Sequence, residues 1–516
     1  MNAKQTGSFY TPKSLVNYMS TYALEKGHSL AVLEPSAGDG RFIEKFYNYA
    51  KKIDAIEIDN YKINNLTDKW HEKVELICAD FVQFSLESER KYNLIIGNPP
   101  YITKKVLSET ERNKSLELVK YWSLSDSIFQ NLWVSFVLGA VKLLDHNGAI
   151  FFVLPFEFLQ VHYAEKLRVF LEEKFNVIEI TTFKESVFPD IEQDVCLVYL
   201  TNKEGIEPIV KYTTVKNVED FKPLEYSEIK RNKPLKKWSN SILNDDEIEL
   251  LKDLSVKYTK ISDLGDISPG IVTGANSFFI LNNSAMQKLK SEPYTIPILQ
   301  KGSIIGSLLL FSEDDFNQLV TADKNTWMLN LNGIETSELS LELQDYLSNG
   351  RKLKLHERYK CGKRKLWYEV PVIQSGELMF FKRYNRLPRL VVNKAGIYTT
   401  DISYNVRLHG EFDAQSVAFC FYNSLTITLC EYNGRFYGGG VGELVPSEFK
   451  SLCLPYKRVD KQKVQKLDSM LRTNKPIEKV MEFVDSVVLN DLTENDLELL
   501  KKIRMKYLMR RLKIEV

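Results

Sequence analysis

The sequence predicts an open α/β sheet in the first half of the chain, followed by a second domain of mixed α+β character. Apolar runs at residues 30–33, 53–58 and 74–78 each end close to an acidic residue. This pattern is typical of parallel strands that bring polar groups to one edge of a sheet. The first run continues into a glycine loop and a helical pattern. The length of 516 residues allows two domains, which we place at 1–245 and 246–516.

Composition excludes several classes of protein. The hydrophobic content of 44% is ordinary for a globular chain, and a net charge of +1 confines any nucleic-acid surface to a local patch. The six cysteines form no C-x-x-C pair, and with six scattered histidines they argue against a zinc site or a disulfide framework. We therefore expect reduced core cysteines, no metal ion and a cytoplasmic location.

No stretch of the chain is expected to enter a membrane. The polar N-terminus lacks the pattern of a signal peptide. The longest apolar stretch, residues 132–144, is too short to span a bilayer and contains Lys142.

The glycine loop after the first strand suits a ligand with a cationic end. Gly38 and Gly40 allow backbone N–H groups to approach a ligand closely. Glu34 and Asp39 would repel a pyrophosphate but would attract the ammonium group of an amino acid. A glycine loop with acids at both ends is more specific than a lone pair of glycines.

Acids near the ends of the next two strands extend the predicted site. Glu57 lies 17 residues beyond Gly40, about the spacing at which an acid holds ribose hydroxyls. Asp80 can accept a hydrogen bond from an adenine amino group while Phe81 packs on the adenine ring. A solvated strand end is the alternative for each acid taken alone, but three in succession favour a ligand site.

A rigid turn follows the strand predicted at residues 92–97. Asn98-Pro99-Pro100-Tyr101 presents an amide, free carbonyls and an aromatic ring at the carboxyl end of that strand. An exocyclic amino nitrogen is a poor nucleophile because its lone pair is conjugated into the base. The Asn98 side chain and the Pro99 carbonyl would accept its hydrogens and draw it toward tetrahedral geometry, while Tyr101 would stack on the flipped base. The turn therefore predicts methylation of an amino group.

The remaining pattern predicts further elements of the same domain. Thr11 is predicted to cap a helix whose first residue is Pro12. Phe188 is placed to stack the base opposite Tyr101, and a buried hydrophobic residue is the alternative for it. The pattern also predicts a mobile loop at 103–120, helices at 125–144 and 158–175, strands at 149–154, 177–182 and 195–200, and a charged connection at 203–245.

In this order, over residues 7–200, the motifs resemble the gamma class of N6-adenine DNA methyltransferases, of the TaqI and Eco57I type. The resemblance implies a Rossmann-like class I SAM-dependent methyltransferase domain, a C-terminal target recognition domain, and S-adenosyl-L-methionine (SAM) as cofactor. The cofactor contacts that it implies are Thr11, Glu34, Ser36, Gly38, Glu57, Asp80 and Phe81. The catalytic residues that it implies are Asn98, Pro99, Pro100, Tyr101 and Phe188.

Two basic clusters in the second half fit contact with phosphate. Residues 351–365 contain eight lysines or arginines and one acid, and a second cluster at 382–394 encloses an aromatic and an amide residue. A solvated face is the alternative for such runs. Residues 270–278 resemble the start of the family's recognition domain, and the tail at 477–512 is predicted to be an amphipathic helix. The predicted DNA contacts are Lys363, Arg364, Lys365, Lys382 and Arg383.

We therefore expect a site-specific DNA methyltransferase that modifies N6 of a flipped-out adenine in double-stranded DNA within a restriction-modification system. We expect a monomer, with any cognate restriction endonuclease encoded separately, since no nuclease pattern stands out. The alternatives are an N4-cytosine DNA or rRNA methyltransferase, a protein-glutamine N-methyltransferase, which can carry the same proline turn, and a non-catalytic DNA-binding subunit.

Overall fold

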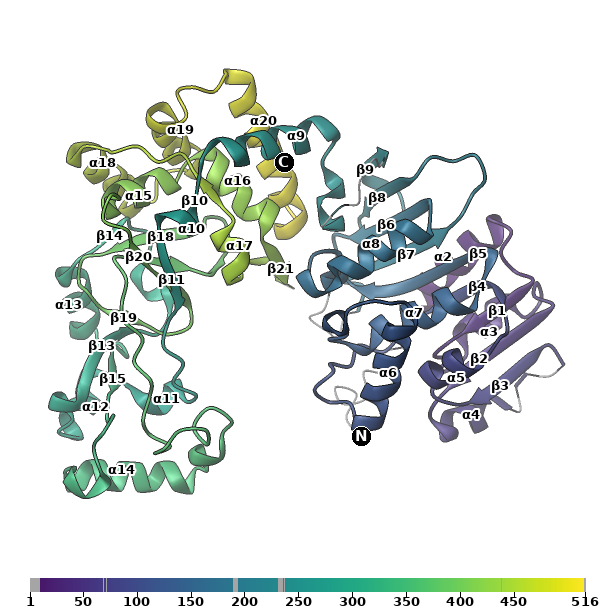
Figure 1. Ribbon diagram of the computed structural model, residues 1–516, viewed down its shortest axis with the longest axis horizontal. Coiled ribbons are helices and arrows are strands. Elements are labelled where there is room, and N and C mark those ends of the chain that lie inside the picture. The colour runs from purple at the N-terminus through teal and green to yellow at the C-terminus, as the bar shows by residue number, and fades with distance from the viewer. Residues whose placement is uncertain are drawn as a thin grey trace. The chain divides into compact units, whose positions relative to one another are not determined.

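The computed structural model describes residues 10–67, 69–70, 72–188, 194–230, 235, 237–437 and 439–514. The chain divides into two compact units (Figure 1). The first comprises Met1–Asp246 with Tyr437–Gly439, and the second comprises Glu247–Phe436 with Gly440–Val516.

A mixed sheet forms the centre of the first unit. Its strands are β1 (Ala31–Glu34), β2 (Lys52–Glu57), β3 (Val74–Cys78), β4 (Tyr92–Gly97), β5 (Leu144–Pro155), β6 (Val177–Phe183), β7 (Val195–Thr201), β8 (Ile209–Val215) and β9 (Pro223–Lys230). The strand order is β3-β2-β1-β4-β5-β7-β6-β8-β9. Strands β1 to β5 pair in parallel, and β7 runs antiparallel between β5 and β6. Chain order reverses between β1 and β4, so the predicted Rossmann-like methyltransferase fold is confirmed.

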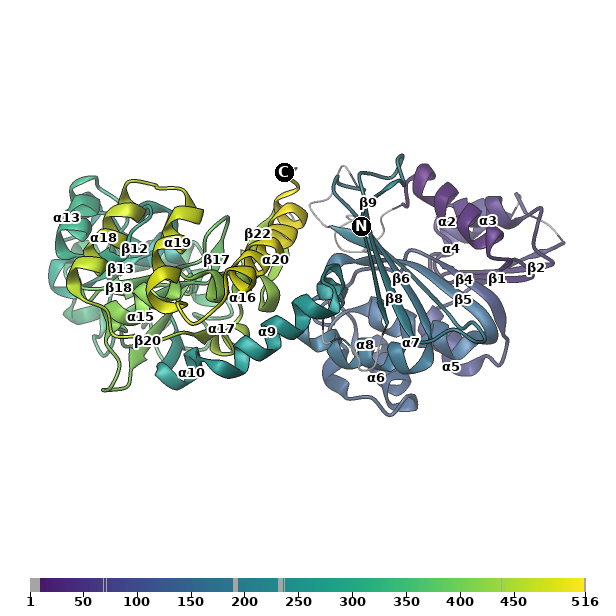
Figure 2. The same ribbon diagram turned by 90° about the horizontal axis from the view of Figure 1, so that it is seen from above.

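Helices cover both faces of this sheet. They are α2 (Lys13–Glu25), α3 (Arg41–Phe46), α4 (Asn60–Thr67), α5 (Phe81–Glu87), α6 (Glu109–Tyr121), α7 (Leu132–Leu143) and α8 (Glu165–Lys174). Figure 2 shows α2 and α3 on one face and α5 to α8 on the other. Leu15 and Met19 of α2 lie in one buried cluster with Phe42 and Phe46 of α3 and with strand side chains, as expected for amphipathic helices on a sheet.

Two predicted elements on the second face differ from the structure for local reasons. Residues 109–121 form helix α6 rather than a mobile loop, because Ser108 and Glu111 close a capping box at its start. Helix α7 begins at Leu132, later than predicted, because the Asn131 side chain caps it there. Helix α6 buries little apolar surface, so its polar composition is similar to that of a loop.

Three further expectations about this unit are corrected. Residues 156–164 include two short 3₁₀ turns, so α8 begins only at Glu165. The region 203–245 contains β8 and β9, which extend the sheet beyond β6. Pro12 occupies the N-cap of α2 without a side-chain hydrogen bond, so Thr11 does not cap that helix.

The second unit is mixed α+β, as predicted. Its strands are β10 (Thr259–Lys260), β11 (Gly265–Pro269), β12 (Ile280–Leu281), β13 (Thr295–Leu299), β14 (Leu310–Phe311), β15 (Trp327–Leu329), β16 (Leu378–Phe381), β17 (Arg383–Tyr384), β18 (Arg389–Asn393), β19 (Tyr398–Thr399), β20 (Ser403–Leu408), β21 (Arg435–Tyr437), β22 (Val441–Glu443) and β23 (Cys453–Leu454). The largest sheet has the order β11-β20-β16-β18-β14.

Helices of the second unit surround these sheets. They are α9 (Asp245–Lys257), α10 (Ile261–Leu264), α11 (Asn276–Phe279), α12 (Asn283–Lys288), α13 (Glu313–Thr321), α14 (Leu341–Lys352), α15 (Ala414–Phe421), α16 (Ser424–Asn433), α17 (Pro446–Lys450), α18 (Lys461–Arg472), α19 (Ile477–Val488) and α20 (Glu494–Leu512). The predicted helical tail is therefore split into α19 and α20.

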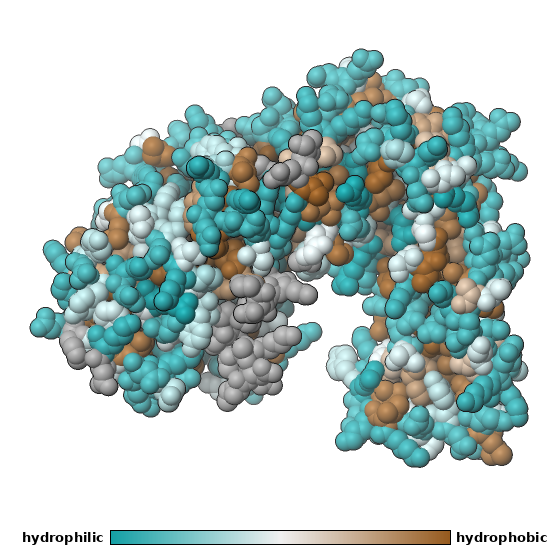
Figure 3. Space-filling view, turned by 180° about the vertical axis from the view of Figure 1, so that it is seen from behind, coloured by the Kyte–Doolittle hydropathy of each residue, from teal (hydrophilic) through white to brown (hydrophobic). Residues whose placement is uncertain are grey.

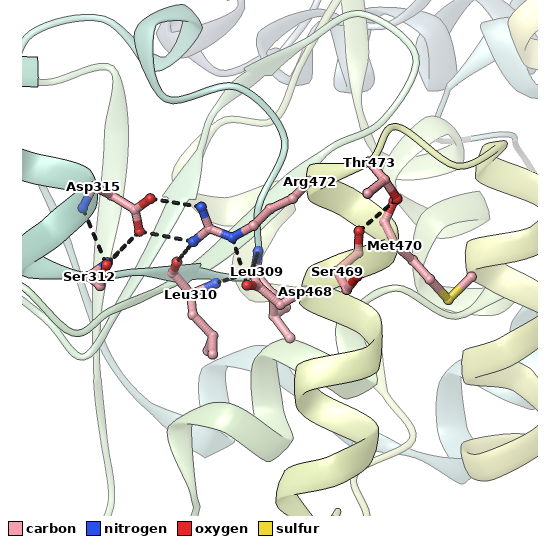
Figure 4. A network of polar contacts seen from close by, with 9 residues as sticks. All are labelled: Leu309, Leu310, Ser312, Asp315, Asp468, Ser469, Met470, Arg472 and Thr473. Carbon is pink, nitrogen blue, oxygen red and sulfur yellow. Dashed lines mark hydrogen bonds and ion pairs between the residues drawn. The ribbon is translucent and has the colours of Figure 1, made fainter. Parts of the chain in front are cut away.

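An arginine at the end of α18 ties that helix to α13 and to β14 before it (Figure 4). Arg472 donates to the two carboxylate oxygens of Asp315 at 2.7 and 2.9 Å and to the Leu310 carbonyl at 2.7 Å. Asp468, one turn earlier, accepts from the backbone N–H groups of Leu309 and Leu310 at 2.8 and 3.0 Å. Because a planar guanidinium matches a carboxylate, this pair fixes the end of α18.

Hydrophobic residues on the viewed surface are dispersed among polar ones (Figure 3). Figure 3 shows a mostly hydrophilic face on each unit. Within the described ranges, no helix is long and apolar enough to cross a bilayer. The cysteines are free, and five are buried, but Cys78 at the end of β3 is exposed, contrary to the expectation that all six are core residues. The residues that the structure describes contain no cluster of potential metal ligands.

Candidate active site

Four of the predicted residues follow one edge of the sheet. Strands β3, β2, β1 and β4 are neighbours, and Asp80, Glu57, Glu34 and Asn98 lie at or just beyond their carboxyl ends. Parallel strands end on the same side of a sheet, so these residues form a row in that order. An extended ligand along this edge would meet three acids and then an amide.

The glycine loop after β1 adopts a backbone conformation that few other residues tolerate. Gly38 and Gly40 have φ angles of 56° and 78°, where a Cβ atom is strained. A Cβ on Gly40 would also come within 2.9 Å of Leu66 Cδ2. The Gly38 N–H donates to Glu57 Oε2 at 3.0 Å, so the loop is tied to the end of β2.

A small cavity of about 40 Å³ opens beside this loop. Its lining includes five of the predicted residues, namely Thr11, Glu34, Ser36, Gly38 and Asn98. Such a space holds only a few water molecules. A larger ligand must therefore displace lining side chains or extend along the sheet edge toward Glu57 and Asp80.

Glu34 is the buried acid of this cavity. Its side chain is 3% exposed, and its Oε2 atom has no hydrogen-bond partner among the described residues. Burial raises the pKa of Glu34 well above its usual range, and the carboxyl groups of Asp39 and Glu57 raise it further, while a backbone hydrogen bond from Ile43 partly opposes them. A ligand cation would stabilise the ionised form. The site therefore fits SAM, which carries an ammonium group on its methionine part and a positively charged sulfonium.

Glu57 and Asp80 make contacts within the protein that orient their carboxylates. Glu57 accepts from the Gly38 N–H. Asp80 accepts from the Val82 N–H at 2.9 Å and so caps α5, and its second oxygen pairs with Lys114 of α6 at 3.2 Å. Each carboxylate offers about four acceptor positions, so these contacts leave capacity for a ligand.

The turn after β4 packs directly against the glycine loop. The Ser36 hydroxyl donates to the Asn98 backbone carbonyl at 3.1 Å. Pro99 is buried, whereas Asn98 and Pro100 are half-buried. The predicted cofactor loop and the predicted catalytic turn thus share one wall of the cavity.

The Phe81 ring is packed in the core, whereas stacking on a cofactor requires an exposed ring. Its side chain is 2% exposed, and its ring centroid lies 4.7 Å from that of Phe136 on α7. Contact with an adenine ring would need this packing to loosen, so the cofactor role of Phe81 stays a prediction.

The two aromatic residues predicted to hold a base lie in one hydrophobic cluster. Phe188 is 6% exposed, and Tyr101 packs against the cluster that contains it. The Tyr101 hydroxyl donates to the Val153 carbonyl at 3.1 Å, and burial raises the pKa of Tyr101 well above its ordinary value. Pro189, the second residue of the Phe-Pro element, lies outside the described residues. The stacking roles therefore stay predictions.

Tyr10 and Arg41 also line the cavity, and neither was predicted from the sequence. Arg41 donates to the Thr11 carbonyl at 2.6 Å and pairs with Asp39 at 2.7 Å. It therefore compensates the more exposed acid of the loop and leaves Glu34 for a ligand cation. The available signal was the position of Arg41 as the first helical residue after the glycine loop.

The first group of predicted DNA contacts is mixed. Lys363 and Lys365 are exposed. The Arg364 guanidinium instead donates to the carbonyls of Val272 and Thr273 at 3.0 and 2.7 Å, and burial lowers its pKa. Arg364 therefore holds the 272–273 backbone in place, and its role as a phosphate contact stays a prediction.

The second group, Lys382 and Arg383, belongs to the same unit. Lys382 is half-buried with its ammonium 3.7 Å from an Asp401 oxygen, and Arg383 is exposed with its guanidinium 3.3 Å from a Glu443 oxygen. Both line a cleft of about 1190 Å³. Their contact with DNA stays a prediction.

Comparison with known sequences finds two matching protein families. Residues 15–188 match the Eco57I restriction-modification methylase, and residues 235–489 match the C-terminal domain of Type II methyltransferase M.Eco57I. Type II methyltransferase M.AccI of Acinetobacter calcoaceticus is 24% identical over 489 residues, which cover 89% of this chain and 87% of that protein. M.XamI of Xanthomonas campestris pv. amaranthicola, also a Type II methyltransferase, is 21% identical over 88% of this chain and 86% of its own.

Solved structures show the same fold. The Type IIL restriction-modification enzyme MmeI in complex with DNA aligns with a TM-score of 0.63 at 12% identity, over 96% of this chain and 75% of that chain. A DrdV–DNA complex aligns with a TM-score of 0.51 at 13% identity, over 91% of this chain and 57% of that chain. With the two family matches spanning most of the sequence, the chain belongs to the Eco57I-type restriction-modification methylase family.

Proposed function

We propose that this protein is a Type II DNA methyltransferase that transfers a methyl group from SAM to the N6 amino group of adenine in double-stranded DNA. Family membership supports the reaction class and the cofactor. We assign catalysis to residues 1–245 and target recognition to 246–516. The protein would act as a monomer beside any separately encoded restriction endonuclease.

The observation that carries the proposal is the row of residues along the sheet edge. Asp80 would accept from the adenine amino group of SAM, and Glu57 from its ribose hydroxyls. The buried Oε2 of Glu34, which has no hydrogen-bond partner in the described part of the chain, would meet the methionine ammonium. Asn98 follows at the next strand end, so the transferable methyl group would lie between the cofactor row and the proline turn.

The proline turn would activate the target nitrogen. SAM supplies an electrophilic methyl group on a sulfonium. The Asn98 side-chain oxygen and the Pro99 carbonyl would accept the two N6 hydrogens and pull the nitrogen lone pair out of conjugation with the ring. Tyr101 and Phe188 would hold the flipped base by stacking, which requires their rings to open toward the substrate. Methyl transfer would form an N–C bond and break the S–CH₃ bond, so the cofactor sulfur leaves as a neutral thioether and one N6 proton is released to water.

Asn98→Ala tests this assignment. A preorganised acceptor aimed at developing charge contributes about 10²–10³ in rate, so single-turnover methylation should fall by that factor while SAM affinity is retained. Asn98→Asp keeps an acceptor oxygen and should retain more turnover than the alanine variant. Nucleoside analysis of plasmid DNA treated with labelled SAM identifies the product.

Two results would contradict the proposal. One is a wild-type single-turnover rate in Asn98→Ala. The other is a product other than N6-methyladenine: N4-methylcytosine would identify the cytosine alternative, and methylated RNA or protein would identify the other two enzymatic alternatives.

A further inference from the structure

A large cleft in the second unit carries positive charge that the active site does not use. It measures about 1190 Å³ and is lined by parts of segments 301–307, 381–389, 474–480 and 504–514. Among its described lining residues, Asp401 and Glu478 are the only acids. The lysines and arginines that line it are Lys301, Lys382, Arg383, Arg386, Arg389, Lys475 and Arg504.

Two of these arginines hold the walls of the cleft together. Arg389 donates to the Gly302 carbonyl at 2.9 Å, and its guanidinium lies 4.8 Å from the centre of the Phe381 ring. Arg504 is 3% exposed and donates to the Arg386 carbonyl at 3.4 Å. Their positive groups are used for backbone contacts, so they shape the cleft more than they offer charge to a ligand.

The walls are anchored from both sides before any ligand binds. Arg511 of α20 is buried, pairs with Glu431 at 2.7 Å and donates to the Asn385 carbonyl, which fixes the backbone next to Arg386. On the other side, the Arg472 contacts shown in Figure 4 fix the end of α18, three residues before Lys475. Such preorganisation limits the entropy lost when a ligand binds.

Three cations of the cleft are free to meet a ligand. Lys301, Arg386 and Lys475 are exposed, and none of them forms an ion pair with a carboxylate in the described part of the chain. They come from three separate segments, so the structure brings their charges to one cleft.

The rest of the lining distinguishes a nucleic-acid backbone from a free anion. Leu471, Val480, Met505 and Leu508 contribute apolar surface between the cations. A sugar–phosphate backbone alternates apolar deoxyribose carbons with charges about 3.4 Å apart along the axis of each strand. A single phosphate would fill little of a cleft of 1190 Å³ and would leave its apolar lining unused.

We propose that this cleft holds the sugar–phosphate backbone of the DNA duplex, with Lys301, Arg386 and Lys475 as phosphate contacts. The inference rests on the proposed function and adds to it a surface that supplies affinity and orientation without reading sequence.

The test is the triple variant Lys301→Gln, Arg386→Gln and Lys475→Gln in the full chain. Duplex binding is measured by fluorescence anisotropy over a series of salt concentrations. The log–log salt slope should fall by roughly 0.9 for each phosphate interaction removed, about 2.7 for all three, and each removal should weaken binding about eightfold at ~0.1 M salt. Lys475→Gln alone should lower the slope by roughly 0.9 and serves if the triple variant does not fold.

A matched control removes the same charge elsewhere on the second unit. Lys252, Lys324 and Lys461 are exposed and do not line the cleft, so their triple glutamine variant should keep the wild-type slope. SAM affinity by calorimetry should be unchanged in both variants.

The outcomes separate this inference from the proposed function. An unchanged slope in the cleft variants, with wild-type protein that binds and methylates DNA, overturns the cleft and leaves the function standing. A reduced slope, with wild-type protein that makes no N6-methyladenine, supports the cleft and refutes the function. If the triple variant loses binding of inorganic phosphate but keeps the DNA slope, the cleft is an anion site and the inference fails.

Discussion

Replacing Glu34 by glutamine should weaken cofactor binding and change the pH dependence of stability in a direction that a structural role would not produce. The side chain is 3% exposed and its Oε2 atom has no hydrogen-bond partner among the described residues. An ionised carboxylate buried in this way destabilises the folded protein until a cation binds beside it. Glu34→Gln keeps the size of the side chain and removes its charge.

The sign of the stability effect follows from the raised pKa of Glu34. The folded protein holds this proton more tightly than the unfolded chain, whose glutamate pKa is about 4.3. The free energy of unfolding therefore falls as pH rises from the unfolded pKa through the folded one, by about 1.4 kcal/mol for each pKa unit between them. Glu34→Gln should remove that fall, so the variant gains stability relative to the wild type as pH increases above about 4.

Glu34→Gln should weaken SAM binding although it stabilises the folded protein. A hydrogen bond to a charged group contributes about 1.5–3 kcal/mol, so SAM affinity should fall about 10- to 160-fold. Urea unfolding at several pH values gives the stability difference, and its pH dependence is the readout because the new amide has hydrogen-bond requirements of its own. Calorimetry with SAM gives the affinity.

Glu44→Gln is the matched control. Glu44 lies on α3, outside the cavity, with a side chain 60% exposed, so the same substitution there should change neither quantity appreciably. Unchanged SAM affinity in Glu34→Gln would refute the placement of the cofactor ammonium beside this carboxylate. A pH profile parallel to that of the wild type would refute the raised pKa.

Two further predictions concern residues whose contacts the structure redefines. Arg364→Gln should lower the melting temperature because it removes hydrogen bonds to the Val272 and Thr273 carbonyls, and it should leave the salt slope of DNA binding unchanged. Joint replacement of Lys363 and Lys365 by glutamine should instead lower that slope by up to about 1.8. Tyr101→Phe should lower the free energy of unfolding by about 0.5–1.5 kcal/mol because it removes the hydrogen bond to Val153, with little loss of turnover. Tyr101→Ala should lose about 1–3 kcal/mol of base stacking, measured with 2-aminopurine at the target position. Equal fluorescence in the two variants would contradict a stacking role.

The sequence by itself determined the first four strands of the catalytic half and the residues that follow them. Residues 74–78 and 92–97 form strands with the predicted bounds, because each is a short, largely apolar run that ends where polar residues or proline begin. The glycine loop was predictable for the same reason, since the positive φ angles of Gly38 and Gly40 depend on residue type more than on distant contacts. These features are local in the chain.

Predictions from local composition were wrong for two segments whose composition is shared by loops and by regular secondary structure. The polar run that forms α6 resembles a loop, and only the capping box of Ser108 and Glu111 distinguishes it. The proline-punctuated region after β7 resembles a connection, yet β8 and β9 complete the sheet because β6 offers a free edge for pairing. The capping box is a local signal that the polar composition obscured, whereas the pairing of β8 with β6 forms only when the rest of the domain is folded.

Only the tertiary structure decided which residues meet and which are buried. The row from Asp80 to Asn98 depends on strand order, which follows from backbone pairing between segments far apart in the chain. Arg364 and Lys363 are neighbours in one basic run, but only Arg364 is held by carbonyls, one of them 92 residues away. The cleft with Lys301 and Lys475 has no counterpart in any local pattern, because charge becomes a binding surface only after packing has brought separate segments together and left their cations unpaired.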